Sequence, residues 1–189
     1  MPSPHGVKTS AYRPVVMGLR GAVASGHPLA SQAGIRILQE GGNAVDAAIA
    51  VGAALNVVEP HMSGIGGDGF IMVYSAEHNE LKIANGTGAA PLRSDAAMFR
   101  KTGIPRKGIL SVSVPGLCDA WLTAHEQYGR LSLEKVLAPA IELCEEGFAV
   151  SHKLAQAIAE ETPPLASIPF SSELFCRDGR PLRPGEICR

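Results

Sequence analysis

Apolar residues recur at helical spacing in residues 27–41, the first stretch of the chain with a clear pattern. Ala30, Ala33, Ile37 and Leu38 fall near one face there, which predicts an amphipathic helix. The glycine pair that follows favours a helix end, because glycine adopts the left-handed backbone that closes many helices. The next apolar stretch therefore belongs to a separate element.

Residues 43–60 form that element, and they are apolar on nearly every side. Such a pattern predicts a helix that is buried on most sides. Asn43 and Asp46 stand at the spacing of a capping box, with aspartate in place of the usual glutamate. Glu59 precedes a proline, and the residue before a proline resists helical geometry, so the helix should end there. We interpret Asp46 as a helix-start residue rather than a catalyst.

A glycine-rich loop, HMSGIGGDG, leads from this helix into two short apolar runs. Residues 70–75 predict a buried strand and residues 81–85 its returning partner, joined by a polar turn as a hairpin. Apolar and polar residues alternate in residues 109–114, which predicts a further strand. More helices are expected at residues 94–99, 117–129, 132–146 and 151–161.

Capping residues and a proline refine the predicted bounds of these later helices. Ser94 and Ser151 precede two of them and are expected to act as N-caps. Pro139 lies inside a third and predicts a kink or a break, because proline removes a backbone donor. The helix that Ser151 starts is expected to be the last, and turns are expected after it. The whole pattern is that of a helix-rich α+β chain with a few strands.

The composition of the 189 residues excludes several classes of protein. Hydrophobic residues are 46% and charged residues 19%, whereas a disordered chain is poorly hydrophobic and highly charged. A net charge of −1 argues against a nucleic-acid partner, which would need a basic surface. Residues 44–58 are too few to span a bilayer. We interpret residues 1–20 as a leader that lacks the apolar core of a signal peptide, and we predict a cytoplasmic protein with no membrane partner.

Motifs for bound metals and nucleotides are weak in this sequence. The four cysteines are far apart and the histidines lack paired ligand spacing, so we expect free thiols and no metal. Residues 64–69 satisfy GxGxxG, but a dinucleotide site needs that motif after a strand and before a helix. Here the loop follows a helix and precedes a strand. We expect close backbone approach and positive φ at these glycines, and no cofactor; an active-site wall is the alternative.

No self-contained catalytic constellation stands out in the chain. Glu59 and Asp68 flank the glycine-rich loop and could act as an acid–base pair, although loop capping is the ordinary role of such residues. Ser63 lacks the flanking pattern of a nucleophile elbow. Cys118 falls in a predicted helix with no histidine nearby in the sequence. We therefore assign no catalytic residue to this chain.

A longer pattern does indicate a function. The segments GGNAVDAA, VEPHMSGIGG and SVPG, in this order and spacing, resemble the γ-glutamyltransferase family of N-terminal-nucleophile hydrolases. The family includes glutathione hydrolases and some cephalosporin or glutaryl acylases. The resemblance continues through YGRLSLEKVLAPAIELCEEGF and DGRPLRPGE and covers roughly residues 21–189. It implies part of a four-layered αββα sandwich, with residues 21–189 as an incomplete, N-terminal portion of the large-subunit region.

The chemistry of this family implies a partner for the chain. Members are made as one precursor that cuts itself into a large subunit and a small subunit, which then begins with a threonine. That hydroxyl attacks a γ-glutamyl amide, its freed α-amine (pKa about 7.7–8.0) acts as base, and water or an amine takes the acyl group. The resemblance places this threonine and the oxyanion glycines in the small subunit, so the isolated chain is expected to be inactive. Threonines that do not match the cleavage motif are Thr9, Thr87, Thr102, Thr123 and Thr162.

One departure from the family concerns the substrate. Members that process glutathione carry an arginine in a pattern like R-E-x-A-P, and this arginine grips the substrate α-carboxylate. The matching stretch here is residues 87–91, so Thr87 occupies the arginine position and is the one substrate-binding residue that we assign. Threonine offers a hydrogen bond but no charge. Arg93 is close by in the sequence and could substitute for that arginine, although its position does not match the motif.

Two classes of function follow from these observations. The first is acyl transfer or amide hydrolysis through an acyl-enzyme, on a small-molecule γ-glutamyl compound or, because of Thr87, on another small amide. The second is a non-catalytic half that pairs with a missing C-terminal part, and it predicts large exposed apolar patches on the isolated chain. A nucleotide-binding module on the glycine-rich loop is the weakest alternative.

Overall fold

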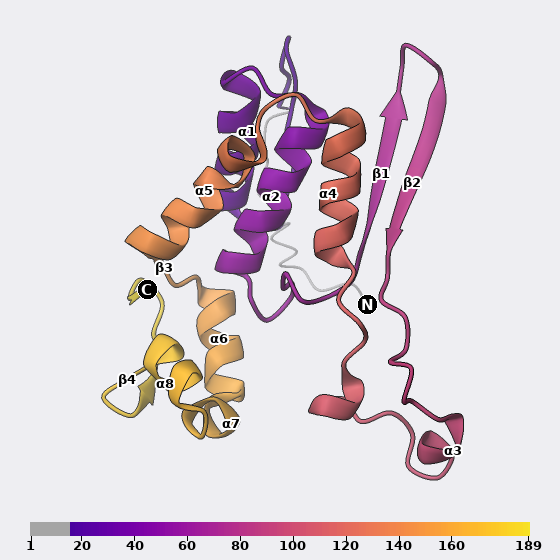
Figure 1. Cartoon of the computed structure of the whole chain (residues 1–189). Coiled ribbons are helices and arrows are strands. Elements are labelled where there is room, and N and C mark those ends of the chain that lie inside the picture. Colours follow the sequence, from indigo (N-terminus) through magenta and orange to yellow (C-terminus); the bar gives the residue numbers. More distant parts are fainter. Residues whose placement is uncertain (1–15) are drawn as a thin grey trace, which may run out of the picture.

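The computed structural model describes residues 16–189, so the predicted leader lies outside the described residues as far as residue 15 (Figure 1). The helices are α1 (Pro28–Gln39), α2 (Ala44–Val58), α3 (Ala96–Phe99), α4 (Leu117–Tyr128), α5 (Leu133–Glu146), α6 (His152–Glu160), α7 (Thr162–Ala166) and α8 (Pro169–Phe175), with a short 3₁₀ turn at Ile109–Ser111. The strands are β1 (Gly69–Ser75), β2 (Glu80–Gly86), β3 (Phe148–Ala149), β4 (Cys176–Arg177), β5 (Arg180–Pro181) and β6 (Ile187–Cys188). Within residues 16–189 they form three two-stranded antiparallel sheets.

Helix α2 lies at the centre of the larger helical group, with α1, α4 and α5 around it (Figure 1). One apolar core joins α2, α4 and α5 and includes Ile49, Trp121 and Val136. A second core surrounds α6 and includes Phe148 and Leu154. The helix-rich α+β fold and the burial of most of α2 are therefore confirmed.

The N-terminus of α2 carries the capping box that the sequence predicts. The Asn43 side chain accepts hydrogen bonds from the amides of Val45 and Asp46 at 2.9 and 3.0 Å, and the Asp46 carboxylate accepts from the Asn43 amide at 2.9 Å. Asp46 is fully buried, and its oxygens also accept from the amides of Arg130 and Leu131 at 3.1–3.3 Å. The carboxylate thus joins the start of α2 to the turn after α4, which confirms its structural role.

Strands β1 and β2 pair along their whole length, so the predicted hairpin is confirmed. Ile71 and Val73 pack against the core, and both strands contact α4. On the other face of β1, Phe70, Met72 and Tyr74 are 60–66% exposed. The prediction of a buried strand is therefore wrong. The strand is apolar on both faces, but within residues 16–189 only one of those faces is covered.

Two predictions fail in the extended arm between β2 and α4. Residues 109–114, which alternate like a strand, form the 3₁₀ turn and an irregular stretch that joins no sheet of the described residues. Gly108 begins the turn with φ of 94°, a left-handed conformation that favours glycine. The N-cap of α3 is Asp95 rather than Ser94, because its carboxylate accepts from the Ala97 amide at 2.9 Å.

The C-terminal part of the described chain contains more helix than the sequence predicts. Helix α5 runs unbroken through Pro139, a buried residue, so the expected break is absent. Ser151 caps α6 as predicted, but α6 is not the last helix. Turns are expected after α6, but Pro163 and Pro164 there lie in α7, because proline is compatible with the first turn of a helix. No helix within residues 16–189 is both long enough and apolar enough to cross a membrane.

Candidate functional site

Three segments that are distant in the sequence meet at the open end of the β1–β2 hairpin, beside the start of α4 (Figure 1). They are residues 64–69 of the glycine-rich loop, residues 85–89 at the end of β2, and residues 113–117 at the start of α4. We call these segments the hairpin-exit site. It contains Thr87, which the family resemblance predicts to contact the substrate.

Backbone hydrogen bonds hold the hairpin-exit site together. The Gly67 carbonyl accepts from the amides of Gly116 and Leu117 at 3.2 and 3.0 Å, and the Val114 amide donates to the Ala89 carbonyl at 3.0 Å. The first two donors belong to the N-terminus of α4, where amides have no partner inside the helix. The glycine-rich loop is thereby fixed to the start of α4.

The positions that cannot accept a side chain lie in the segments that pack against the glycine-rich loop, rather than in the middle of the loop. A Cβ on Gly88 would lie 1.6 Å from the Val114 carbonyl oxygen, and a Cβ on Gly116 would lie 2.5 Å from the Gly86 oxygen. A Cβ on Gly66, by contrast, would have no other atom within 4 Å. None of the loop glycines has a positive φ, so the prediction of left-handed backbone there is wrong.

The Asp68 carboxylate links all three segments. Its Oδ1 accepts from the Gly88 amide at 2.6 Å, and the Ser113 hydroxyl donates to its two oxygens at 3.0–3.1 Å. No lysine, arginine or histidine of residues 16–189 forms an ion pair with it. Of the two roles that the sequence suggests for Asp68, these contacts favour the capping of a loop.

Thr87 lies exposed at the edge of the hairpin-exit site. Its amide and its hydroxyl both donate to Oδ1 of Asn85, at 3.0 and 2.6 Å. Sequence reasoning missed Asn85, because its contact depends on the local turn after β2. The Thr87 hydroxyl oxygen can still accept a hydrogen bond from a ligand. Arg93 lies further along the exposed arm, in a turn.

Glu59 has different partners from Asp68. It is 8% exposed, and its Oε1 lies 3.7 Å from Nζ of Lys153 on α6. His27, the N-cap of α1, is close to it. Burial lowers the pKa of His27, and the negative charge of Glu59 opposes that shift. Because the two carboxylates have separate partners, we favour structural roles for both over an acid–base pair.

A side-chain contact that sequence reasoning missed holds the start of the glycine-rich loop. The Ser63 hydroxyl donates to Oδ1 of Asn56 at 2.5 Å, across the turn that ends α2. The Asn56 amide nitrogen is buried and has no hydrogen-bond partner among the described residues. Ser63 thus ties the loop to the helix, a structural role.

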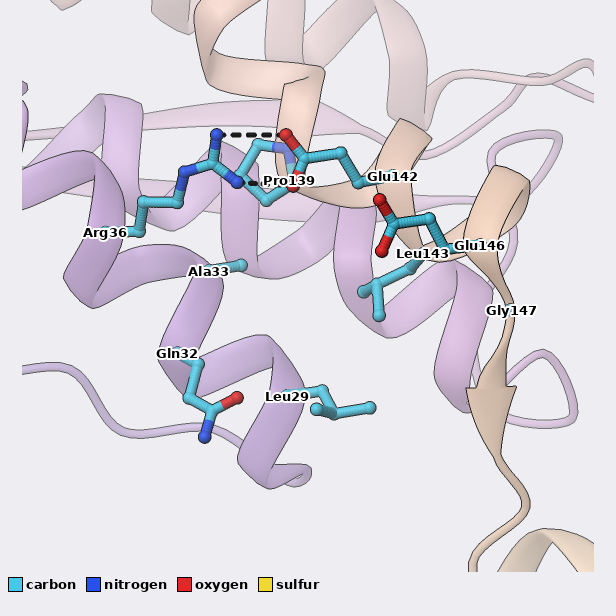
Figure 2. Close-up of a pocket in the computed structure, with 9 residues that line it drawn as sticks. All are labelled: Leu29, Gln32, Ala33, Arg36, Pro139, Glu142, Leu143, Glu146 and Gly147. Carbon is cyan, nitrogen blue, oxygen red and sulfur yellow. Dashed lines mark hydrogen bonds and ion pairs between the residues drawn. The ribbon is translucent and has the colours of Figure 1, made fainter. Parts of the chain in front are cut away.

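A separate hollow of about 280 Å³ lies between α1 and α5 (Figure 2). Arg36 forms a bidentate pair with Glu142 there, at 2.5 and 2.9 Å, and its Nε donates to Glu40 at 2.9 Å. Hydrogen bonds to these carboxylates raise the pKa of Arg36, and the bond from Arg36 lowers the pKa of Glu142. The guanidinium therefore clamps two helices and is not free for an anionic substrate. The sequence cannot reveal this pair, because its members are 106 residues apart.

Metal and thiol chemistry find little support in the described chain. Across residues 16–189, no group of three or more His, Cys, Asp or Glu side chains is placed to hold a metal ion. All four cysteines are free thiols: Cys118 and Cys144 are exposed, and Cys188 is buried. Burial raises the pKa of Cys188, which makes this thiol a poorer nucleophile.

Comparison with known proteins places these features in a family. The gamma-glutamyltranspeptidase family model matches residues 30–189. The glutathione hydrolase-like YwrD proenzyme of Bacillus subtilis is 43% identical over 173 residues, which are 90% of this chain and 33% of that protein. This chain therefore spans about a third of the length of that curated relative.

Solved structures share the fold. A gamma-glutamyltranspeptidase from Helicobacter pylori matches with a TM-score of 0.85 and 32% identity, over 93% of this chain and 52% of that one. A cephalosporin acylase from Bacillus halodurans matches with a TM-score of 0.86 and 38% identity, over 100% of this chain and 37% of that one. These similarities confirm the expected N-terminal-nucleophile hydrolase fold, of which this chain forms a part. The chain belongs to the gamma-glutamyltranspeptidase family.

Proposed function

We propose that this chain is the N-terminal part of an enzyme that transfers or hydrolyses the acyl group of a small amide through an acyl-enzyme. The family match over residues 30–189 carries the proposal. The nucleophile is a threonine supplied by a part of the protein outside this chain, and no metal or cofactor takes part. Residues 21–189 act as the N-terminal portion of the large-subunit region, in the cytoplasm.

The hairpin-exit site supplies substrate-binding groups in this proposal. Thr87 presents a neutral hydroxyl where glutathione-processing members of the family have an arginine. A hydrogen bond to a charged group is worth about 1.5–3 kcal/mol, so losing the arginine weakens γ-glutamyl binding by roughly tenfold to a hundredfold. Small amides without an α-carboxylate therefore compete with γ-glutamyl compounds as substrates.

A second candidate is a structural half that is inert until it pairs with the rest of the enzyme. The outer face of the hairpin favours it: large apolar side chains there are 54–66% exposed, namely Phe70, Met72, Tyr74, Leu81 and Ile83. Soluble monomers rarely expose such a continuous apolar surface, which usually marks an interface. Both candidates agree that the isolated chain is inactive and that another part of the protein covers this face.

Intact mass measurement and N-terminal sequencing of the protein purified from its source separate the two candidates. The enzyme proposal predicts two chains, the second of which begins with threonine. A single unprocessed species that hydrolyses no anilide substrate would instead support the structural role.

Substitution of Thr87 tests the substrate assignment in the complete protein. Thr87→Arg should lower the KM for γ-glutamyl-p-nitroanilide by about tenfold or more, because it adds a charge-assisted contact. Thr87→Gln, a long but neutral side chain, is the matched control and should leave that KM within about threefold. If both variants behave alike, Thr87 does not set the specificity.

A further inference from the structure

We infer that Asp68 positions the Thr87 segment and, through its unpaired charge, selects against a substrate carboxylate at that position. This inference rests on the proposed function, because it assumes that substrate binds beside Thr87. Asp68 touches no nucleophile in the described chain, so its role is one of positioning and specificity.

The positioning role follows from the hydrogen bonds of the carboxylate. Asp68 accepts a hydrogen bond from the Gly88 amide at 2.6 Å. That amide is part of the peptide bond between Thr87 and Gly88. Ser113 donates to the same carboxylate from the other side, at 3.0–3.1 Å. Gly88 has no side chain to restrict its backbone, so this bond narrows the conformations that the peptide between Thr87 and Gly88 can adopt.

Close contacts with the backbone of Val114 also restrict this segment. The Gly88 Cα faces the Val114 carbonyl oxygen so closely that a Cβ would lie 1.6 Å from it. The Val114 amide donates in turn to the Ala89 carbonyl at 3.0 Å. Thr87 is held by its two hydrogen bonds to Asn85, and Ala89 by its bond from Val114. Loss of the Asp68 acceptor therefore leaves the Gly88 amide without a partner between two fixed residues.

The selecting role follows from charge. Oδ1 of Asp68 lies 2.6 Å from the Gly88 nitrogen, which places it within about 4 Å of the Thr87 carbonyl carbon across a C–N bond of ~1.33 Å. No basic residue of the described chain forms an ion pair with Asp68. The threonine itself adds no positive charge.

A substrate carboxylate at this position meets a like charge. Two unit charges about 6 Å apart change binding by about threefold in bulk water and by about a hundredfold at the lower dielectric of a protein surface. Because Asp68 is exposed, water screens its charge, and we expect an effect of roughly tenfold, between these limits. A neutral or ammonium-bearing group meets no such repulsion. The site therefore fits an acyl group that presents an amine or no charge beside Thr87, rather than an α-carboxylate.

Two anilides that differ only in the carboxylate test this selection on the complete, processed protein. They are γ-glutamyl-p-nitroanilide and 4-aminobutyryl-p-nitroanilide. Asp68→Asn keeps an oxygen for the Gly88 amide but removes the charge. We expect it to lower the KM for the γ-glutamyl substrate about tenfold, to leave the KM for the 4-aminobutyryl substrate equal or higher, and to keep kcat within about threefold.

Asp68→Ala removes the acceptor as well as the charge. We expect kcat to fall at least tenfold on both anilides, with rescue in Asp68→Asn. Hydrogen exchange should become faster in peptides that contain Gly88 in the alanine variant and stay near the wild-type rate in the asparagine variant. Asp95→Asn is the matched control, since it removes another exposed carboxylate that accepts from a backbone amide, and should change either KM less than twofold.

Each outcome decides one part of the inference. Equal effects of Asp68→Asn on both anilides would overturn the selecting role. Unchanged kcat and unchanged exchange at Gly88 in Asp68→Ala would overturn the positioning role. If the wild-type protein yields no chain that begins with threonine, the proposed function fails and the selecting role falls with it, while hydrogen exchange still decides whether Asp68 positions this segment. If the processed protein cleaves neither anilide, its substrate does not present an amine beside Thr87, and the selecting role alone is overturned.

Discussion

Replacing Asp46 with alanine removes an acceptor that three backbone amides share, and we expect a large loss of stability. The buried carboxylate accepts from the amides of Asn43, Arg130 and Leu131 at 2.9–3.3 Å. Loss of a helix cap costs about 0.5–2 kcal/mol, and each buried donor left without an acceptor costs about 1–3 kcal/mol. These costs overlap because the donors surround one point, so we expect the free energy of unfolding to fall by about 3–5 kcal/mol.

Urea unfolding of the complete protein, followed by far-ultraviolet circular dichroism, measures this change. Glu77→Ala, in the exposed turn of the hairpin, removes a carboxylate without such contacts and should stay within about 0.5 kcal/mol of the wild type. Asp46→Asn keeps one acceptor oxygen and should fall between the two. A loss below about 1 kcal/mol for Asp46→Ala would mean that other groups satisfy the amides, and would refute the reasoning.

Three further predictions concern pH, packing and surface charge. Because burial lowers the pKa of His27 from 6.5, its contribution to stability is present above pH 6.5 and is lost as pH falls through its folded value. His27→Asn, which can still cap α1, should flatten the dependence of Tm on pH in that acidic range. Gly88→Ala should destabilise by more than about 3 kcal/mol, since its Cβ meets a backbone oxygen, whereas Gly66→Ala should cost under about 1 kcal/mol; thermal unfolding compares them. Arg36→Ala should cost only about 0–1 kcal/mol, because both Arg36 and Glu142 are more than 40% exposed, and the difference should shrink at 1 M salt in urea unfolding.

Helix ends could be predicted from the sequence because capping is local. Asn43 and Asp46 stand three residues apart, and their contacts form within one turn, so the spacing is sufficient. Ser94 shows the limit of this reasoning, since the neighbouring Asp95 is an equally good cap and takes the role. Capping residues thus predict where a helix begins to within a residue or two.

Strands could be predicted only where a partner was close in the sequence. The hairpin of β1 and β2 brings its own pairing partner, so alternation and a turn are enough. Residues 109–114 alternate as well, but a strand needs a neighbour for its backbone bonds, and none pairs with them in the described chain. Alternation of apolar and polar residues shows that a segment would have two different faces as a strand, but it does not show whether a neighbouring strand is present to pair with it.

The candidate site was less accessible to sequence reasoning than the fold. Thr87 was found only through a family resemblance, and its assignment stays a prediction. The contacts of Asp68 bridge separations of 20 residues to Gly88 and 45 residues to Ser113, which no local motif encodes. The glycines that matter most, such as Gly88, look like ordinary loop residues until the opposing backbone is in place.

The exposed outer face of the hairpin has a consequence for how the protein is made. A ribosome delivers the chain N-terminus first at about 5–20 residues per second, and domains form as they emerge. The hairpin precedes α4 in this order, so it is complete before the helix that packs against its inner face has emerged. Its outer face, with Phe70, Met72 and Tyr74, stays exposed even when all of residues 16–189 are in place. During that interval the hairpin presents an apolar face and unpaired strand edges, the features that promote association between nascent chains. Under the proposed function, in which another part of the protein covers this face, the yield of the protein in cells should depend on how quickly the face is covered, and on chaperones that shield the hairpin until then.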